Sequence, residues 1–151
     1  MQEGKISVAK NILNDYASKF RGRIDNFSYE TLNKLAYGAE AAKLSFWTAS
    51  TMLSTSFSDF ALTGVINVAS GSQSLLDYDI RKNRPESEYL PAKKASTALF
   101  AGLGGVFLTI GVADAISGRF ERLPHDATAT TASFAQASSE ILHHFADRKK
   151  I

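Results

Sequence analysis

One stretch of the chain restricts its possible folds more than any other. The nineteen residues 95–113, ASTALFAGLGGVFLTIGVA, contain no charged side chain. Coiled as an α-helix they would be about 28 Å long, close to the hydrocarbon thickness of a bilayer, roughly 30 Å. The stretch therefore predicts one long helix, which either spans a membrane or forms the centre of a water-soluble bundle.

The surroundings and the composition of this stretch favour different environments. Lys93 and Lys94 precede it and Arg119 and Arg122 follow it, and long basic side chains at such positions reach lipid headgroups. Seven of the nineteen residues, however, are Gly, Ser or Thr, which makes insertion into lipid less favourable. Both environments stay open at this point.

The glycines of the stretch predict close helix packing. Each glycine costs about 1 kcal/mol of helix propensity relative to alanine, so a helix that keeps several of them has a reason to do so. Small residues let a second helix approach closely, in membranes as well as in soluble bundles. The expected packing positions are Gly102, Gly104, Gly105 and Gly111, together with Gly64 on the preceding helix.

Apolar residues recur at helical spacing through most of the chain, and strand-like alternation is absent from the sequence. The three prolines fall in polar segments, which leaves the rest free to be helical. The sequence therefore predicts an all-α fold of about five helices in a single bundle-like domain with a central hydrophobic helical hairpin. The helices are expected at about residues 6–21, 28–54, from Ser56 or Ser58 to residue 80, from Pro91 or Ala92 to Ser117, and 128–148.

The single domain, residues 1–151, is expected to have three parts. Residues 1–54 would form amphipathic helices, residues 56–117 the hydrophobic hairpin, and residues 127–149 a C-terminal amphipathic helix. The basic, proline-bearing segment 81–94 is expected to be an exposed connector within the hairpin. A chain of 151 residues suits one such domain.

Polar residues line one side of the predicted hairpin. Asp59, Thr63 and Asn67 share a face of its first helix, and Asp114 lies near the end of its second. Carboxylates and amides facing lipid are costly, so this polar seam should face a neighbouring helix, a pore or water. Folding can also bring Asp59 close to Asp114.

Several functional classes find no support in the sequence. Without cysteine there is no disulfide framework, thiolate nucleophile or cysteine-based zinc site. A net charge of +2 with both signs interspersed does not favour nucleic-acid binding. The glycines around Gly102 miss the dinucleotide fingerprint, since Phe107 stands where its third glycine belongs. No catalytic residue and no cofactor are expected, and the protein is not expected to be an enzyme.

The histidines of the last predicted helix are candidate metal ligands. Glu140 and His143 have the Glu-x-x-His spacing of carboxylate-bridged metal bundles, and His144 shares a face with Glu140. Such a site needs a second copy of the motif on another helix, and the sequence has none. We therefore expect structural or solvated roles for these residues and no metal site.

These observations favour a non-enzymatic, membrane-associated helical protein that acts in the assembly of a membrane complex or in channel or pore formation. Its expected partners are lipid and either another protein or further copies of itself. The first residues lack a basic start followed by an apolar segment, so no cleaved secretory signal is expected. The alternative is a cytoplasmic, soluble helical bundle that binds partner proteins as an adaptor, chaperone or structural subunit.

Overall fold

The computed structural model describes residues 2–149, except for the side chains of residues 2–10, 12, 13, 86 and 87. Within these residues the chain is helical without any strand, so the predicted all-α, five-helix fold is confirmed. The α-helices are α1 (Gln2–Ile24), α2 (Tyr29–Met52), α3 (Phe57–Asn83), α4 (Glu86–Ile116) and α5 (Leu123–Asp147), with a short 3-10 helix η1 (Phe120–Arg122) before α5.

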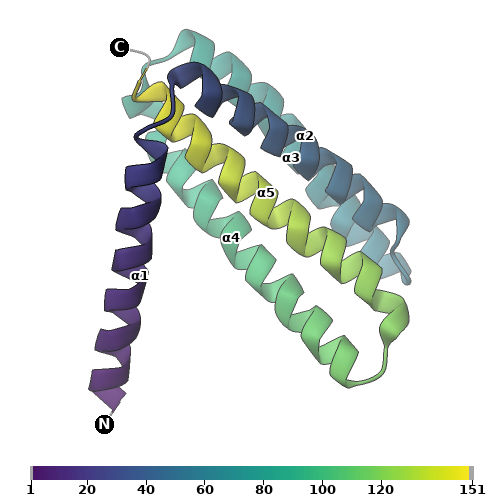
Figure 1. Ribbon diagram of the computed structural model, residues 1–151. Coiled ribbons are helices and arrows are strands. Elements are labelled where there is room, and N and C mark those ends of the chain that lie inside the picture. Colours follow the sequence, from purple (N-terminus) through teal and green to yellow (C-terminus); the bar gives the residue numbers. More distant parts are fainter. Residues whose placement is uncertain (1, 150–151) are drawn as a thin grey trace.

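Helices α2 to α5 form a bundle in which consecutive helices are antiparallel, and α1 extends away from one end of it (Figure 1). Helix α5 packs along α2 on one side and along α4 on the other, and α3 packs mainly against α2. Helices α3 and α4 are consecutive and antiparallel, as a hairpin requires, but the close neighbour of α4 is α5. We call the end that holds the α3–α4 turn the turn end and the opposite end the far end.

The expected connector at residues 81–94 is wrong, because α3 continues to Asn83 and α4 already begins at Glu86. Pro91 lies inside α4, near its start, where a proline removes a single backbone hydrogen bond. Pro124 lies in the first turn of α5, a position where proline is well tolerated. Pro91 and Pro124 therefore lie within helices that begin earlier than the sequence suggested, and Pro85 directly precedes α4.

Local signals set several helix ends. Ser28 caps α2 by accepting a hydrogen bond from the Thr31 amide at 3.1 Å, and Ser56 caps α3 by accepting one from the Asp59 amide at 3.1 Å. Gly118 follows α4 with a φ of 74°, a left-handed conformation that residues with a side chain adopt only under strain. These ends lie within a residue or two of those expected.

The apolar core is small and lies in two parts. The larger part fills the middle of the bundle between α2, α4 and α5, where Trp47, Phe100 and Phe107 pack on alanines of α5. The smaller part, around Ile24 and Leu32, joins the end of α1 to the turn end of the bundle. Most other residues buried on α5 are polar.

Candidate functional site

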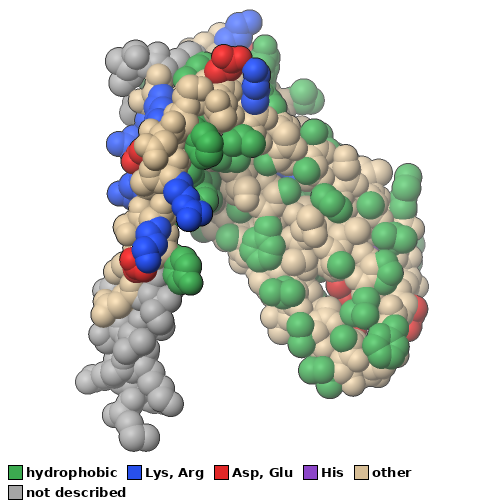
Figure 2. Space-filling view, in the orientation of Figure 1, with side chains coloured by type: hydrophobic (Ala, Val, Ile, Leu, Met, Phe, Trp, Pro, Cys, Tyr) green, Lys and Arg blue, Asp and Glu red, His purple; other side chains and the backbone are tan. Residues whose placement is uncertain are grey.

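The bundle buries polar side chains and exposes apolar ones. Many large apolar side chains of α3 and α4 are more than a third exposed. Figure 2 shows apolar side chains distributed over the face of the bundle on which α4 and α5 lie. Folded soluble proteins rarely expose so continuous an apolar surface unless it binds something. On α3 this apolar exterior comprises Leu62, Val65, Val68, Leu75 and Leu76, and on α4 Leu99, Val106, Leu108, Ile110 and Val112.

Helix α4 has the length and composition of a membrane-spanning helix over Glu88–Ile116. Only 22% of its most apolar window is buried within the chain. The core helix of a soluble protein, which has a similar composition, is mostly buried. By this measure α4 is an outward-facing helix.

Each bundle helix also contains a long stretch without Asp, Glu, Lys, Arg or His. Because packed neighbouring helices run in opposite directions (Figure 1), these stretches lie beside one another. The charged residues of the four helices therefore fall toward the two ends of the bundle. The uncharged stretches, which we call the uncharged belt, are residues 44–58, 60–76, 95–113 and 127–139.

At the turn end, Arg81 and Asp147 form a two-point ion pair outside the belt. Arg81 donates from Nε to Asp147 Oδ2 at 3.0 Å and from a terminal nitrogen to Oδ1 at 2.7 Å, and both side chains are about nine-tenths buried. Burial opposes ionisation of Asp147, but the hydrogen bond and the charge of Arg81 outweigh it, so the pKa of Asp147 lies below its ordinary value. This pair joins α3 to α5.

His143 lies between Arg81 and Glu40. Its Nδ1 contacts the Arg81 guanidinium, which can only donate, so Nδ1 accepts and the proton resides on Nε2. Nε2 then donates to Glu40 Oε1 at 3.0 Å. Burial and the charge of Arg81 lower the pKa of His143, although Glu40 opposes this. The arrangement requires a neutral imidazole that links α3, α5 and α2.

Glu140 has partners different from those of His143. Its carboxylate accepts hydrogen bonds from Gln73 at 2.9 Å, Ser96 at 2.7 Å and Thr97 at 2.6 Å. His144 lies on the groove between α4 and α5, away from the His143 contacts. Among the residues that the structure describes, no group of three or more His, Cys, Asp or Glu is placed to hold a metal ion.

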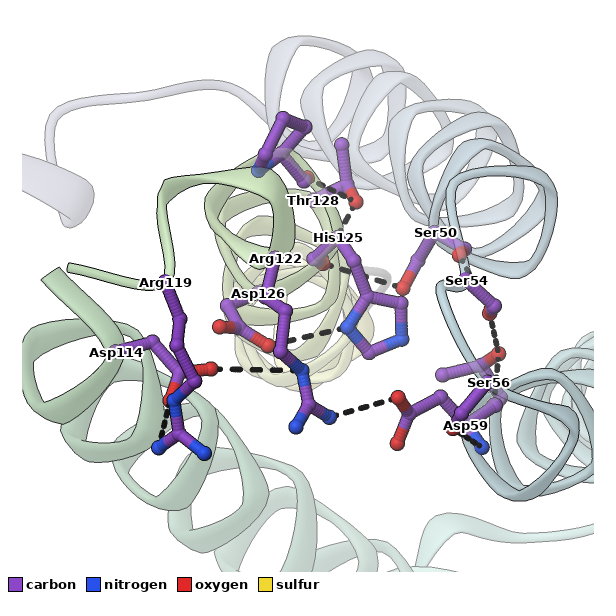
Figure 3. A network of polar contacts seen from close by, with 12 residues as sticks. Ser50, Ser54, Ser56, Asp59, Asp114, Arg119, Arg122, His125, Asp126 and Thr128 are labelled. Atoms are coloured by element: carbon purple, nitrogen blue, oxygen red, sulfur yellow. Dashed lines mark hydrogen bonds and ion pairs between the residues drawn. The ribbon is translucent and has the colours of Figure 1, made fainter. Parts of the chain in front are cut away.

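At the far end, Arg122 lies between two residues of the predicted polar seam (Figure 3). It pairs with Asp59 Oδ2 at 2.7 Å and, through Nε, with Asp114 Oδ2 at 3.5 Å. Arg119 also pairs with Asp114, which is 1% exposed. Asp59 and Asp114 are therefore brought together by a shared arginine, which the sequence had suggested only as a headgroup anchor.

The other two seam residues lie differently. Thr63 is fully buried and donates to the Asp59 carbonyl oxygen at 2.7 Å. Asn67 is half-buried and donates to Thr48 Oγ1 at 3.3 Å. Asn67 therefore faces α2, and the two carboxylates of the polar seam, Asp59 and Asp114, lie at the far end. Thr63 and Asn67 do not contact α4 through these hydrogen bonds.

His125 and Asp126 are buried residues that sequence reasoning missed. His125 Nδ1 lies 3.1 Å from Asp126 Oδ1, and Ser50 donates to the His125 carbonyl oxygen at 3.3 Å (Figure 3). Both residues had been assigned to a polar connector. Both residues lie in the first turn of α5, next to Ser50 of α2. The sequence could not predict their burial, because it does not show which helices pack together.

The glycines predicted as packing positions differ in which helix, if any, lies against them. A Cβ on Gly104 would lie 3.0 Å from the Phe134 ring, and one on Gly111 would lie 3.3 Å from Asp126 Cβ, so both mark the close approach of α4 to α5. Gly64 has a looser neighbour, Thr51 Cγ2 on α2 at 3.8 Å. The expected close approach is not found at Gly102 and Gly105, where a Cβ would meet nothing within 4 Å.

The two buried clusters pair opposite charges and join helices. No protein family model, curated protein or solved structure matches the chain. Its function is therefore to be inferred from this distribution of polar and apolar side chains.

Proposed function

We propose that α2–α5 form a membrane-embedded helical bundle, and that the protein is a non-enzymatic membrane component whose apolar exterior contacts lipid and neighbouring membrane helices. The observation that carries this proposal is the apolar exterior of α3 and α4 at the level of the uncharged belt, over an interior that buries polar side chains, most of them with a polar partner. A bilayer is the solvent in which this distribution is favourable.

The energetic argument compares water with lipid around the same surface. Transferring a Val, Leu or Ile side chain fully out of water is worth about 1.5–3 kcal/mol. The ten exposed residues of the apolar exterior are half or more accessible in most cases, so their transfer contributes on the order of 10 kcal/mol. The charged residues at either end of the belt would lie at headgroup level, where they stay hydrated.

Assembly fits the interior of the bundle better than conduction does. The polar cluster at the turn end and the polar cluster at the far end are separated by Trp47, Phe100 and Phe107 in the middle of the bundle. At the same level of α5 the uncharged Gln136 is hydrogen-bonded to Ser70 and Gln73. Aromatic rings beside uncharged polar side chains do not favour the passage of ions. We therefore favour a role in building a membrane complex over a channel within one chain.

Membrane fractionation of the Val106→Arg variant tests the proposal. Val106 lies in the middle of the belt and is 54% exposed, so its substitution should leave the packed core intact. An arginine at the centre of a bilayer costs about 2.5–3.5 kcal/mol on translocon scales. We expect the wild-type chain to resist extraction from membranes by alkaline carbonate, and the variant to be released to a much larger extent.

Tyr78→Arg is the matched control. Tyr78 is 59% exposed on α3, but it lies outside the belt at the turn end, so this variant should stay in the membrane fraction. If wild type and both variants remain in solution without detergent, with unchanged helical circular dichroism, the membrane proposal is wrong and the soluble adaptor takes its place.

A further inference from the structure

A groove of about 380 Å³ lies between α4 and α5 near the turn end, with the last part of α1 at its edge. Four basic residues line it, and the remainder of its lining is largely apolar. This combination of positive charge and apolar surface suits a ligand that has both an anionic and a hydrocarbon part. The basic residues are Arg21, Lys93, Lys94 and Arg148, and the apolar ones include Ala98, Ala101, Ile141 and Phe145.

Lys93 is the most unusual residue of the groove. Its side chain is more than nine-tenths buried, and its Nζ has no hydrogen-bond partner. The carboxylate paired with it, Asp147, is 3.8 Å away and already accepts hydrogen bonds from Arg81 and Tyr89. Nζ also lies 5.6 Å from the centroid of the Tyr89 ring, a cation–π contact. Neither contact gives the buried ammonium group a hydrogen-bond acceptor, and such a group is costly without one.

The one acidic residue that lines the groove contributes a single negative charge against four basic residues. Glu140 already accepts hydrogen bonds from Gln73, Ser96 and Thr97 with its two carboxylate oxygens. Lys94 and Arg148 are exposed at the rim. The groove therefore keeps an excess of positive charge.

The groove also has a direction. Lys94, Ala98 and Ala101 follow one another along the same face of α4, and the two alanines lie inside the uncharged belt. The basic mouth is at the turn end, where the proposed bilayer position places the headgroups. An acyl chain entering from this mouth would run along small residues toward the hydrocarbon core.

From these observations, and resting on the proposed membrane location, we propose that the groove binds an anionic phospholipid, with its phosphate at Lys93, Lys94 and Arg148 and one acyl chain over Ala98 and Ala101. Basic pockets between membrane helices recognise anionic headgroups in this way. The ligand class is a phosphodiester amphiphile of the membrane itself.

Native mass spectrometry of the full chain in non-ionic detergent tests the site. Dioleoylphosphatidylglycerol should bind more tightly than dioleoylphosphatidylcholine, and Lys93→Met and Arg148→Gln should each weaken the binding of the anionic lipid at least about fivefold. Arg148 is exposed, so its variant tests the site even if Lys93→Met does not fold. Lys34→Gln, an equal change of charge on an exposed residue of α2, is the control and should bind as the wild type does.

Three results would overturn the lipid site: equal binding of the two lipids, equal weakening by Lys34→Gln, or displacement of the lipid by glycerol 3-phosphate at a similar concentration, which would indicate a soluble phosphate ligand. Carbonate-resistant membrane retention is measured in parallel on the same proteins. Retention without a preference for the anionic lipid removes only this inference, whereas loss of retention in the wild type removes the proposed function as well.

Discussion

At the level of residues, the turn end depends on His143 being neutral. Arg81 donates toward Nδ1, and Nε2 donates to Glu40, so a second ring proton would point at a guanidinium. The same arginine holds Asp147 in its ionised form. The hydrogen bonds that Arg81 and Glu40 make with His143 therefore require its neutral form.

We expect acid to weaken the fold through this histidine. Burial and Arg81 lower the pKa of His143 below its ordinary value of 6.5 in the folded protein, so the unfolded chain binds more protons as the pH falls. Its contribution is complete above pH 6.5 and is lost as the pH falls below 6.5 toward the folded pKa. The melting temperature measured by circular dichroism in detergent should drop between pH 7.5 and pH 5.

His143→Gln is the control for this pH dependence. Glutamine retains one donor for Glu40 and one acceptor for Arg81 but does not titrate. Its melting temperature should change less between pH 7.5 and pH 5 than that of the wild type. Glu40 and Asp147, whose pKa values are also lowered, titrate below this range and do not contribute to the difference. An equally steep fall in the variant would show that a group other than His143 causes the effect.

At the level of helices, the packing of α4 on α5 depends on particular small residues. Gly104 lies against Phe134, and Gly111 lies against Asp126, whereas Gly105, one residue from Gly104, faces open space. A side chain at Gly104 would have to displace an aromatic ring. The neighbouring position provides a control within the same turn.

Gly104→Val should therefore destabilise the bundle by about 1–3 kcal/mol, the usual cost of overpacking a contact. Gly105→Val should be neutral or stabilise slightly, because valine has a better helix propensity than glycine. Thermal unfolding of the two variants in the same detergent measures the difference. Equal stabilities would mean that α4 and α5 do not approach each other at Gly104 as described.

At the level of the whole molecule, α1 is largely separate from the bundle. Residues 14–23 are exposed, and among the side chains of α1 that the structure describes Ile24 is the first to enter a core cluster. Lys149 Nζ fixes the turn that follows by donating to the carbonyl oxygens of Asp25 at 2.7 Å and Phe27 at 2.6 Å. The connection of α1 to the bundle is therefore at its last residues.

Deletion of residues 2–20 should leave the stability of the bundle unchanged within about 0.5 kcal/mol, because it retains Ile24 and the turn and removes no described core residue. Thermal unfolding and carbonate extraction of the truncated chain measure stability and membrane retention separately. A clear loss of either would assign to α1 a packing or anchoring role that its exposure does not suggest.

The sequence alone was enough to predict the five helices and the positions of several helix ends. Ser28, Ser56 and Gly118 act through hydrogen bonds or backbone conformation within one turn, so local reasoning finds them. The uncharged residues 95–113 were likewise enough to predict α4 as a long helix. The prolines led to a wrong start for α4, because a proline destabilises a helix much less in its first turns than in its middle. The true start of α4, at Glu86, is also not marked by an apolar residue.

Only the tertiary structure decided which faces are buried and which groups meet. Helical periodicity separates an apolar face from a polar one, but it does not state which of them points outward. That choice depends on pairs such as Arg122 with Asp59 and His143 with Glu40, which are 63 and 103 residues apart in the chain. Their hydrogen bonds make a polar interior favourable, and leave the apolar sides of α3 and α4 on the surface of the bundle.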